Sequence, residues 1–259
     1  MTGEVFMSIN KILIAMAAAI AFSIPAASAQ DDERNLSMIS LFDVDPSKEA
    51  QFDKAWATIR DIAMESGYEY TDYVGGWRNQ RWIVTPLKNY ADVDALMAAR
   101  DAVGEAGGKK FEKALASFSG AMTNSHTFFS RDDNELSYWP NGAPTASYME
   151  INTYHYRYGE QDELRGLLAE YKALMEEKES PYGYQISWDG IGSEGNSFTV
   201  ISYAADAVAM AEANAAVGAM LDGDKKADSI FERFQKISTG SQTTHGTFNP
   251  EASINLPGN

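Results

Sequence analysis

Three histidines, His126, His155 and His245, are the only residues of their kind in the chain of 259 residues. Because imidazole titrates near neutral pH, each could transfer a proton or bind a ligand. His126 and His245 stand in similar segments, Thr-Asn-Ser-His-Thr-Phe and Thr-Thr-His-Gly-Thr-Phe, one near the end of each half of the chain. Two interpretations stay open: both histidines face a central cavity, or a duplication copied a histidine that hydrogen-bonds a turn.

Polar and aromatic residues also alternate along the segment 148–156, which predicts a strand. Successive side chains of a strand point to opposite faces, so Glu150 and Tyr154 face away from the helices if Ile151 packs under them. A cavity lined in this way would suit a small molecule. His245 and Glu150 are the candidate acid–base residues. The predicted ligand-binding residues are His126, Asn152, Tyr154, Trp188 and His245. The alternative is ordinary barrel packing, with the tyrosine hydroxyls satisfied at the rim.

The residue content excludes several kinds of site. The chain has no cysteine, which excludes disulfides, Cys-ligated zinc, iron–sulfur clusters and thiol nucleophiles. Two histidines without a nearby cluster of carboxylates make a poor metal site, so no metal is expected. The GxGxxG spacing at 190–195 joins two predicted strands, whereas a dinucleotide fingerprint needs a strand, a loop and a helix. No bound cofactor is expected, and haem on a single axial histidine stays open as an alternative.

The elements that must hold these side chains recur in the same order in both halves. In the first half we expect a strand at 38–44, a helix at 47–65, and two strands at 68–74 and 81–85. A helical region at 90–118 and a last strand around His126 follow. In the second half the same elements are expected at 148–156, 161–178, 182–188, 198–203, 206–237 and around His245.

Glycines and residue alternation refine this outline. Gly75-Gly76 is expected to be the turn between the second and third strands, and Gly107-Gly108 is expected to interrupt the first long helical region. Asp222-Gly223 is expected to do the same in the second half. In the first strand, alternation suggests that Ile39 and Leu41 pack under the helices, which leaves Ser40 and Phe42 on the opposite face.

The order βαββαβ, present twice, is the ferredoxin-like unit, and tandem copies of it resemble the dimeric α+β barrel superfamily. The resemblance implies an α+β fold in which two antiparallel sheets pack face to face as a pseudo-dimeric barrel. The segment Glu150–Tyr154, with Tyr158-Gly159 before the next helix, is similar to the opening of a NIPSNAP-like domain. The superfamily includes cofactor-free monooxygenases and, as a distant branch, haem-binding chlorite dismutases, so the fold alone does not identify a reaction.

These patterns also divide the chain. We expect the first ferredoxin-like repeat at 30–130, a linker at 131–145, the second repeat at 146–250 and a C-terminal tail at 251–259. One chain would then supply both sheets of the barrel. A monomer is therefore feasible, and a homodimer stays open.

Residues 1–29 are interpreted as an upstream extension and a cleavable secretory signal. Lys11 precedes an apolar run from Ile12 to Ile24, and Ala27-Ser28-Ala29 supplies the small residues that signal cleavage requires. The apolar run is too short to cross a bilayer, so no membrane span is expected. An exported chain without cysteine suits a bacterial periplasm or secretion. A net charge of −16 disfavours binding to nucleic acid.

Together these observations favour an exported barrel protein that binds a small apolar or aromatic molecule in a central pocket. One alternative is a cofactor-independent monooxygenase-like or isomerase enzyme. A second alternative is a structural or interaction module of the cell envelope. Whether the protein is an enzyme stays open at this point.

Overall fold

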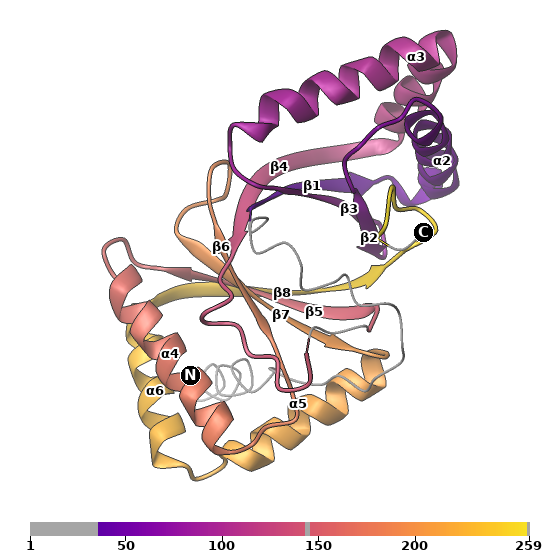
Figure 1. Ribbon diagram of the computed structural model, residues 1–259. Coiled ribbons are helices and arrows are strands. Elements are labelled where there is room, and N and C mark those ends of the chain that lie inside the picture. Colours follow the sequence, from indigo (N-terminus) through magenta and orange to yellow (C-terminus); the bar gives the residue numbers. More distant parts are fainter. Residues whose placement is uncertain (1–35, 143–145, 258–259) are drawn as a thin grey trace, which may run out of the picture. The chain divides into compact units, whose positions relative to one another are not determined.

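The computed structural model describes residues 36–142 and 146–257 (Figure 1). The predicted secretory signal at 1–29 lies outside the described residues. Within the described part of the chain, no helix is long and apolar enough to cross a membrane. The described residues form two compact units. We call residues 36–131, 190–193 and 246–257 the first unit, and residues 132–142, 146–189 and 194–245 the second unit.

The first unit is built on an antiparallel sheet. Its elements are β1 (Leu36–Val44), the short 3-10 helix η1 (Pro46–Lys48), α2 (Glu49–Glu65), β2 (Tyr73–Trp77), β3 (Gln80–Leu87), α3 (Asp92–Ala121) and β4 (Met122–Asp132). Strand β1 pairs with β3 and β4, and β3 also pairs with β2, so the strand order is β4-β1-β3-β2. Helices α2 and α3 lie on the same side of this sheet (Figure 1).

The second unit repeats this order. Its elements are β5 (Tyr148–Tyr156), α4 (Gln161–Glu177), β6 (Gln185–Asp189), β7 (Ser197–Ala204), α5 (Ala207–Leu221), α6 (Lys225–Ile237) and β8 (Ser238–Phe248). The strand order is β8-β5-β7-β6, which matches the first unit strand by strand. The predicted break at Asp222-Gly223 is confirmed, because α5 ends just before it. Helix α6 then starts at an Asp224 carboxylate that accepts the backbone N–H groups of Lys226 and Ala227.

The predicted arrangement of the sheets is wrong. The eight strands form one closed barrel in the order β1-β3-β2-β8-β5-β7-β6-β4, not two open sheets that pack face to face. Within the first unit, the edge of β2 pairs with the end of β8 through Gly75 with Phe248 and Gly76 with Thr247. An open edge leaves backbone N–H and C=O groups without partners, and this pairing satisfies them. Alternation along a strand predicts its faces but not which strand pairs with its edge.

The expectation that Gly75-Gly76 forms a turn is also wrong. Both glycines lie inside β2, and the hairpin turn falls instead at Arg78-Asn79, between β2 and β3. A Cβ atom on Gly75 would collide with the indole of Trp82 and would lie 2.6 Å from the carbonyl oxygen of Thr247. The glycine is therefore required by close packing within the sheet, which sequence patterns do not distinguish from a turn.

The faces of the first strand in each unit are opposite to those predicted. Phe42 lies 5.3 Å from Phe118 of α3, measured between ring centroids, and Tyr154 lies 5.4 Å from Phe234 of α6. Ser40, Phe42, Glu150 and Tyr154 therefore face the helices, not the interior of the barrel. Both faces of these strands carry a mixture of polar and apolar residues, so alternation fixes which residues share a face but not which face the helices cover.

The close packing at Gly75 leads to a prediction about stability. We expect Gly75→Ala to lower the free energy of unfolding by about 1–3 kcal/mol, because the added methyl group overpacks the sheet. The matched control is Gly166→Ala in α4, where a Cβ would meet nothing within 4 Å. That change should stabilise the protein slightly, because alanine is the better helix former. Urea unfolding of both variants provides the measurement, and equal stability of Gly75→Ala and the parent would contradict the close packing.

Candidate functional site

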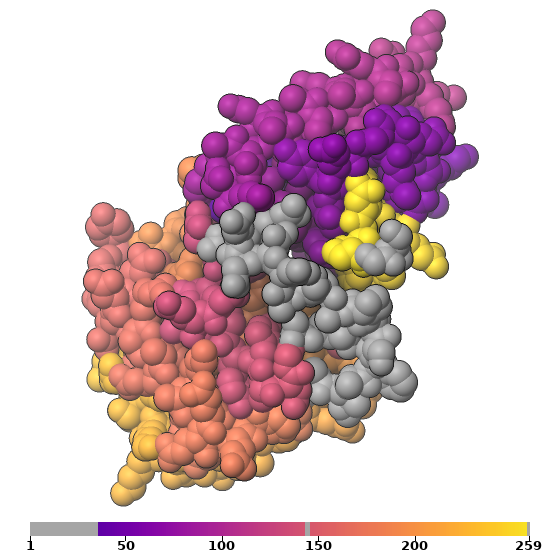
Figure 2. Space-filling view, viewed as in Figure 1, coloured from indigo at the N-terminus to yellow at the C-terminus, as the bar shows by residue number. Residues whose placement is uncertain are grey.

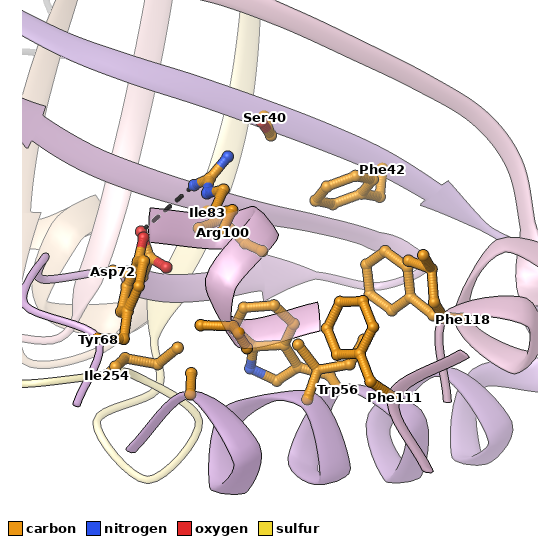
Figure 3. A pocket seen from close by; sticks show the side chains of 14 residues that line it. Ser40, Phe42, Trp56, Tyr68, Asp72, Ile83, Arg100, Phe111, Phe118 and Ile254 are labelled. Carbon is orange, nitrogen blue, oxygen red and sulfur yellow. Dashed lines mark ion pairs between the residues drawn. The ribbon is translucent and has the colours of Figure 1, made fainter. Parts of the chain in front are cut away.

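A cavity of about 190 Å³ lies inside the first unit, between the sheet and helices α2 and α3 (Figure 3). Strands β1 and β3 supply its floor, and the two helices supply most of its walls. Its lining is largely apolar, with a few polar side chains. The lining residues are Ser40, Phe42, Trp56, Ile59, Ala63, Tyr68, Asp72, Ile83, Arg100, Val103, Phe111, Leu115, Phe118 and Ile254.

One part of the cavity is aromatic. Phe118 lies 5.3 Å from Phe42 and 6.1 Å from Trp56, measured between ring centroids. Phe111 joins this group because α3 is interrupted at Gly108, whose φ of 48° and ψ of −133° are not helical. The predicted interruption at Gly107-Gly108 is thus confirmed. Glycine tolerates this positive φ, so the second part of α3 can change direction there.

The other part of the cavity is polar. Asp72 is buried and forms an ion pair with Arg100, whose Nη2 lies 3.5 Å from Oδ1 (Figure 3). The Thr85 hydroxyl donates a hydrogen bond to the same carboxylate oxygen and accepts one of 3.1 Å from Arg100 Nη2. Burial raises the pKa of the Asp72 carboxyl, although Arg100 and the hydrogen bond from Thr85 act in the opposite direction. Desolvation dominates because it disfavours the charged form.

Tyr68 adds a hydroxyl to this polar part. Its side chain is buried, and the hydroxyl forms no hydrogen bond of normal geometry with any residue that the structure describes. Burial raises the pKa of this phenol, and the nearby Asp72 charge raises it further. The hydroxyl therefore stays protonated at neutral pH. The hydroxyl lies next to Asp72 and Arg100, but in poor geometry for a hydrogen bond, so a ligand oxygen could be a better partner.

The segment after β8 forms one wall of the cavity. Ile254 is 2% exposed, pairs with Asp72 in an isolated β-bridge and lines the cavity. Asn255 donates its side-chain N–H to the Tyr68 carbonyl, and the Trp56 indole N–H donates to the Ala252 carbonyl at 2.7 Å. Figure 2 shows this segment in yellow on the surface of the first unit. Residues predicted to form a tail therefore contribute a wall of the site.

The predicted residues Glu150 and Asn152 lie together in the second unit, and neither lines this cavity. Both are buried, and Asn152 donates its amide to Glu150 Oε1 at 3.2 Å. Asn214 of α5 donates to both oxygens of Glu150, at 3.4 and 3.3 Å. The Thr243 hydroxyl donates to Asn152 Oδ1 at 2.6 Å. This network joins β5, α5 and β8 beneath the helices of the second unit.

The two histidines do not occupy equivalent positions. Strands β4 and β8 each contain 11 residues, and His126 is the fifth residue of β4 whereas His245 is the eighth residue of β8. His126 stacks on Phe128, with ring centroids 5.6 Å apart. His245 Nδ1 lies 2.9 Å from the Tyr148 hydroxyl, within hydrogen-bonding distance. When β4 and β8 are superposed from their first residues, the two similar motifs are therefore offset by three positions. Neither histidine lines the cavity.

Tyr154 and Trp188 also lie in the second unit. Tyr154 is 2% exposed and packs in the core against Phe198, with ring centroids 5.2 Å apart. The Trp188 indole donates to Asp133 Oδ2 at 2.9 Å, and the Arg165 guanidinium lies 5.4 Å from the centroid of the Trp188 ring. These contacts give both residues packing roles. Their assignment as ligand-binding residues stays a prediction.

The polar residues of the cavity were missed in the sequence, although one signal for them was available. Leu96, Arg100 and Val103 share one face of α3, and Leu96 and Val103 are buried. A lone arginine on the apolar face of a helix predicts a buried anionic partner or a ligand. Asp72 carries no comparable signal, because its burial depends on the pairing with Ile254, which lies 182 positions later by the residue numbers.

The cavity residues do not fit a haem. Protein ligands of haem iron are His, Cys, Met and Tyr side chains. The lining of the 190 Å³ cavity contains only Tyr68 from this set, and its hydroxyl sits beside the Asp72–Arg100 pair. Among the described residues, no three His, Cys, Asp or Glu side chains form a group that could hold a metal ion.

Comparisons with known proteins bear on the fold. No family model matches the chain, and no curated protein matches it significantly. An anthrone oxidase-like protein aligns with a TM-score of 0.58 and 15% identity, over 85% of this chain and 92% of that one. A protein from Lactobacillus acidophilus proposed to be a monooxygenase aligns with a TM-score of 0.51 and 9% identity, over 86% of this chain and 96% of that one. A chlorite dismutase from Candidatus Nitrospira defluvii aligns with a TM-score of 0.52 and 8% identity, over 85% of this chain and 93% of that one.

Identities this low show the fold alone. The three structures share the dimeric α+β barrel fold with its ferredoxin-like halves, so that part of the predicted resemblance is confirmed. The narrower similarity to NIPSNAP-like domains stays a prediction.

The buried Asp72 leads to a prediction about pH. The Asp72 pKa is raised in the folded state, so the unfolded chain loses this proton first as pH rises above 3.8. Ionisation of Asp72 therefore lowers the stability of the parent as pH rises through its folded pKa. Asp72→Asn cannot ionise and should lack this loss. The stability of Asp72→Asn minus that of the parent should thus rise from about pH 3 to about pH 7 in urea titrations. A difference that stays constant or falls would contradict the raised pKa.

Proposed function

We propose that the first unit binds a small, single-ring aromatic molecule that carries one polar substituent. The observation that carries this proposal is the 190 Å³ cavity, which is aromatic in one part and holds an ion pair and a poorly hydrogen-bonded hydroxyl in another. Ligand sites of this kind combine apolar walls with a few polar groups that fix the orientation of the ligand.

The size of the cavity limits the ligand. A dry apolar cavity of about 150 Å³ is known to bind benzene. Drug-sized ligands occupy sites of roughly 300–1,000 Å³. At about 190 Å³, this cavity fits one substituted ring and is too small for a fused three-ring molecule unless its walls move.

The polar part of the cavity selects the substituent. The Tyr68 hydroxyl can donate a hydrogen bond to a ligand oxygen or accept one from a ligand hydroxyl, which would satisfy a buried group that is otherwise poorly hydrogen-bonded. Arg100 adds donors beside it, and Asp72 holds that guanidinium in place. A phenol or an aryl ketone matches these groups, whereas a hydrocarbon would leave them unsatisfied.

Filling the cavity tests this proposal. We expect p-cresol to bind the parent, and Ala63→Phe to abolish binding because the added ring occupies the cavity beside Trp56. Binding can be measured by calorimetry. The matched control is Ala50→Phe on the exposed side of α2, which should bind like the parent. Toluene should bind about tenfold more weakly than p-cresol, because it leaves the Tyr68 hydroxyl unpaired. Undiminished p-cresol binding by a folded Ala63→Phe variant would refute the proposal.

A second candidate function is a cofactor-independent oxygenase that acts on a phenol in this cavity. Two of the structures with the same fold are described as anthrone oxidase-like or as proposed monooxygenases. A buried carboxyl with a raised pKa, Asp72, adjoins the cavity and is a suitable general base for a phenolic proton. The reacting phenol would itself supply all four electrons: one atom of O2 would enter the ring to form a quinone, and the other would leave as water.

Oxygen uptake in the presence of hydroquinone tests this second candidate. We expect uptake above the background rate for the parent, and a loss of about a hundredfold or more for Asp72→Asn, in keeping with the usual contribution of a general base. The control is Asp61→Asn at an exposed position of α2, which should retain the parent rate. Background uptake by the parent, together with tight phenol binding, would leave binding as the function and eliminate the enzyme.

A further inference from the structure

A second, larger hollow of about 680 Å³ lies on the first unit and is not part of the site described above. It is bounded by α2, by the hairpin of β2 and β3, and by the end of β8 with the segment that follows. The lining residues are Phe52, Asp53, Trp56, Ala57, Arg60, Val74, Gly75, Gly76, Trp77, Arg78, Arg81, Thr247, Phe248, Asn249, Pro250, Glu251 and Ala252. We call this hollow the groove.

Three arginines line the groove, and carboxylates pair with two of them. The chain has a net charge of −16, and three of its nine arginines line this one surface. Only two carboxylates, Asp53 and Glu251, line it with them. Since an acidic surface repels anions, an arginine that has no carboxylate partner is the place on such a protein where an anion can bind.

Two of these arginines have structural partners. Arg81 lies 3.4 Å from a Glu49 carboxylate oxygen and 3.5 Å from Asp53, and it donates a hydrogen bond of 2.5 Å to the Arg78 carbonyl. Arg60 pairs with Asp61 at 2.7 Å and donates to the Glu251 carbonyl. Both arginines therefore hold the walls of the groove together.

Arg78 differs from the other two. Its side chain is exposed, and its guanidinium forms no ion pair or hydrogen bond with any residue that the structure describes. It stands at the first position of the two-residue turn between β2 and β3, with a φ of 53°. Glycine, asparagine and aspartate favour this conformation, and a long side chain there is strained. The contact from Arg81 to the Arg78 carbonyl holds the turn in this strained state.

Aromatic side chains complete the groove. Trp77 precedes the turn. The ring of Phe248 in β8 lies 6.0 Å from that of Tyr73 in β2, measured between centroids, and the two rings are tilted by 52°. Trp56 lines both the groove and the smaller cavity, and its indole is fixed to the Ala252 carbonyl at 2.7 Å. Trp56 therefore forms a wall between the two hollows, which makes them separate sites.

We propose that the groove binds a small aromatic carboxylate, with Arg78 as the residue that recognises its charge. A guanidinium matches a carboxylate with two parallel hydrogen bonds, and it does so better than an ammonium group. The ring of the ligand packs on the aromatic lining. The strained backbone at Arg78 is then explained, because it presents the guanidinium at the edge of the groove. This proposal does not depend on the function proposed for the smaller cavity.

Calorimetric titration with 2-naphthoate tests this proposal. The parent is expected to bind, and Arg78→Gly should bind at least about tenfold more weakly, because a charge-assisted pair of hydrogen bonds is lost. Arg78→Lys should fall between the two. Since glycine relieves the positive φ, Arg78→Gly should unfold at the same temperature as the parent or at a higher one. A loss of binding in that variant therefore cannot result from unfolding.

Three comparisons keep the result specific. Lys54→Ala removes an exposed positive charge of α2 that does not line the groove, and it should bind like the parent. Ala63→Phe fills the smaller cavity and should also leave binding of 2-naphthoate unchanged. Inorganic phosphate should bind much more weakly, because it lacks a ring. The proposal is overturned if Arg78→Gly binds like the parent, if Ala63→Phe abolishes binding, or if phosphate binds as tightly as 2-naphthoate.

Discussion

The pairing between the edge of β2 and the end of β8 determines much of the first unit. Gly75 has no side chain, so the Trp82 indole and the carbonyl oxygen of Thr247 can approach it closely, and Gly76 pairs with Thr247 in the ladder. This pairing directs the segment after β8 back across α2, where Ala252 accepts the hydrogen bond from Trp56. The same segment brings Ile254 against Asp72. One close backbone approach thus builds a wall of the cavity and one side of the groove.

The ion pair between Asp72 and Arg100 is the second constraint, and it is an electrostatic one. Asp72 is buried, whereas 34% of the Arg100 side chain is exposed, so water shares in compensating the guanidinium charge. The ion pair therefore adds little net stability. It does require that the residues around it offer polar groups to the two charges. Thr85 contacts both partners, and the Tyr68 hydroxyl lies beside them in poor geometry for a hydrogen bond. The polar substituent of the proposed ligand would complete this group.

The two units use the same order of elements for different purposes. In the second unit, Tyr154, Tyr171 and Phe234 pack beneath the helices in a continuous core. The polar residues of that face, Glu150 and Asn152, satisfy one another and Asn214. In the first unit the helix-covered face instead holds the 190 Å³ cavity. A duplicated unit can diverge in this way because a small change in side-chain volume decides whether a space is filled or stays open.

The sequence by itself determined the order βαββαβ in each half, the positions of most helices and strands, and the breaks at Gly107-Gly108 and Asp222-Gly223. These features depend on residues near one another in the chain, through periodicity, caps and glycine. It did not determine that the sheet closes, which face of β1 and β5 the helices cover, or that His126 and His245 are out of register. Nor did it bring Asp72 together with Arg100 and Ile254. Those features depend on contacts between segments far apart in the chain, and only the tertiary structure decides which strand pairs with an edge and which charge finds a partner.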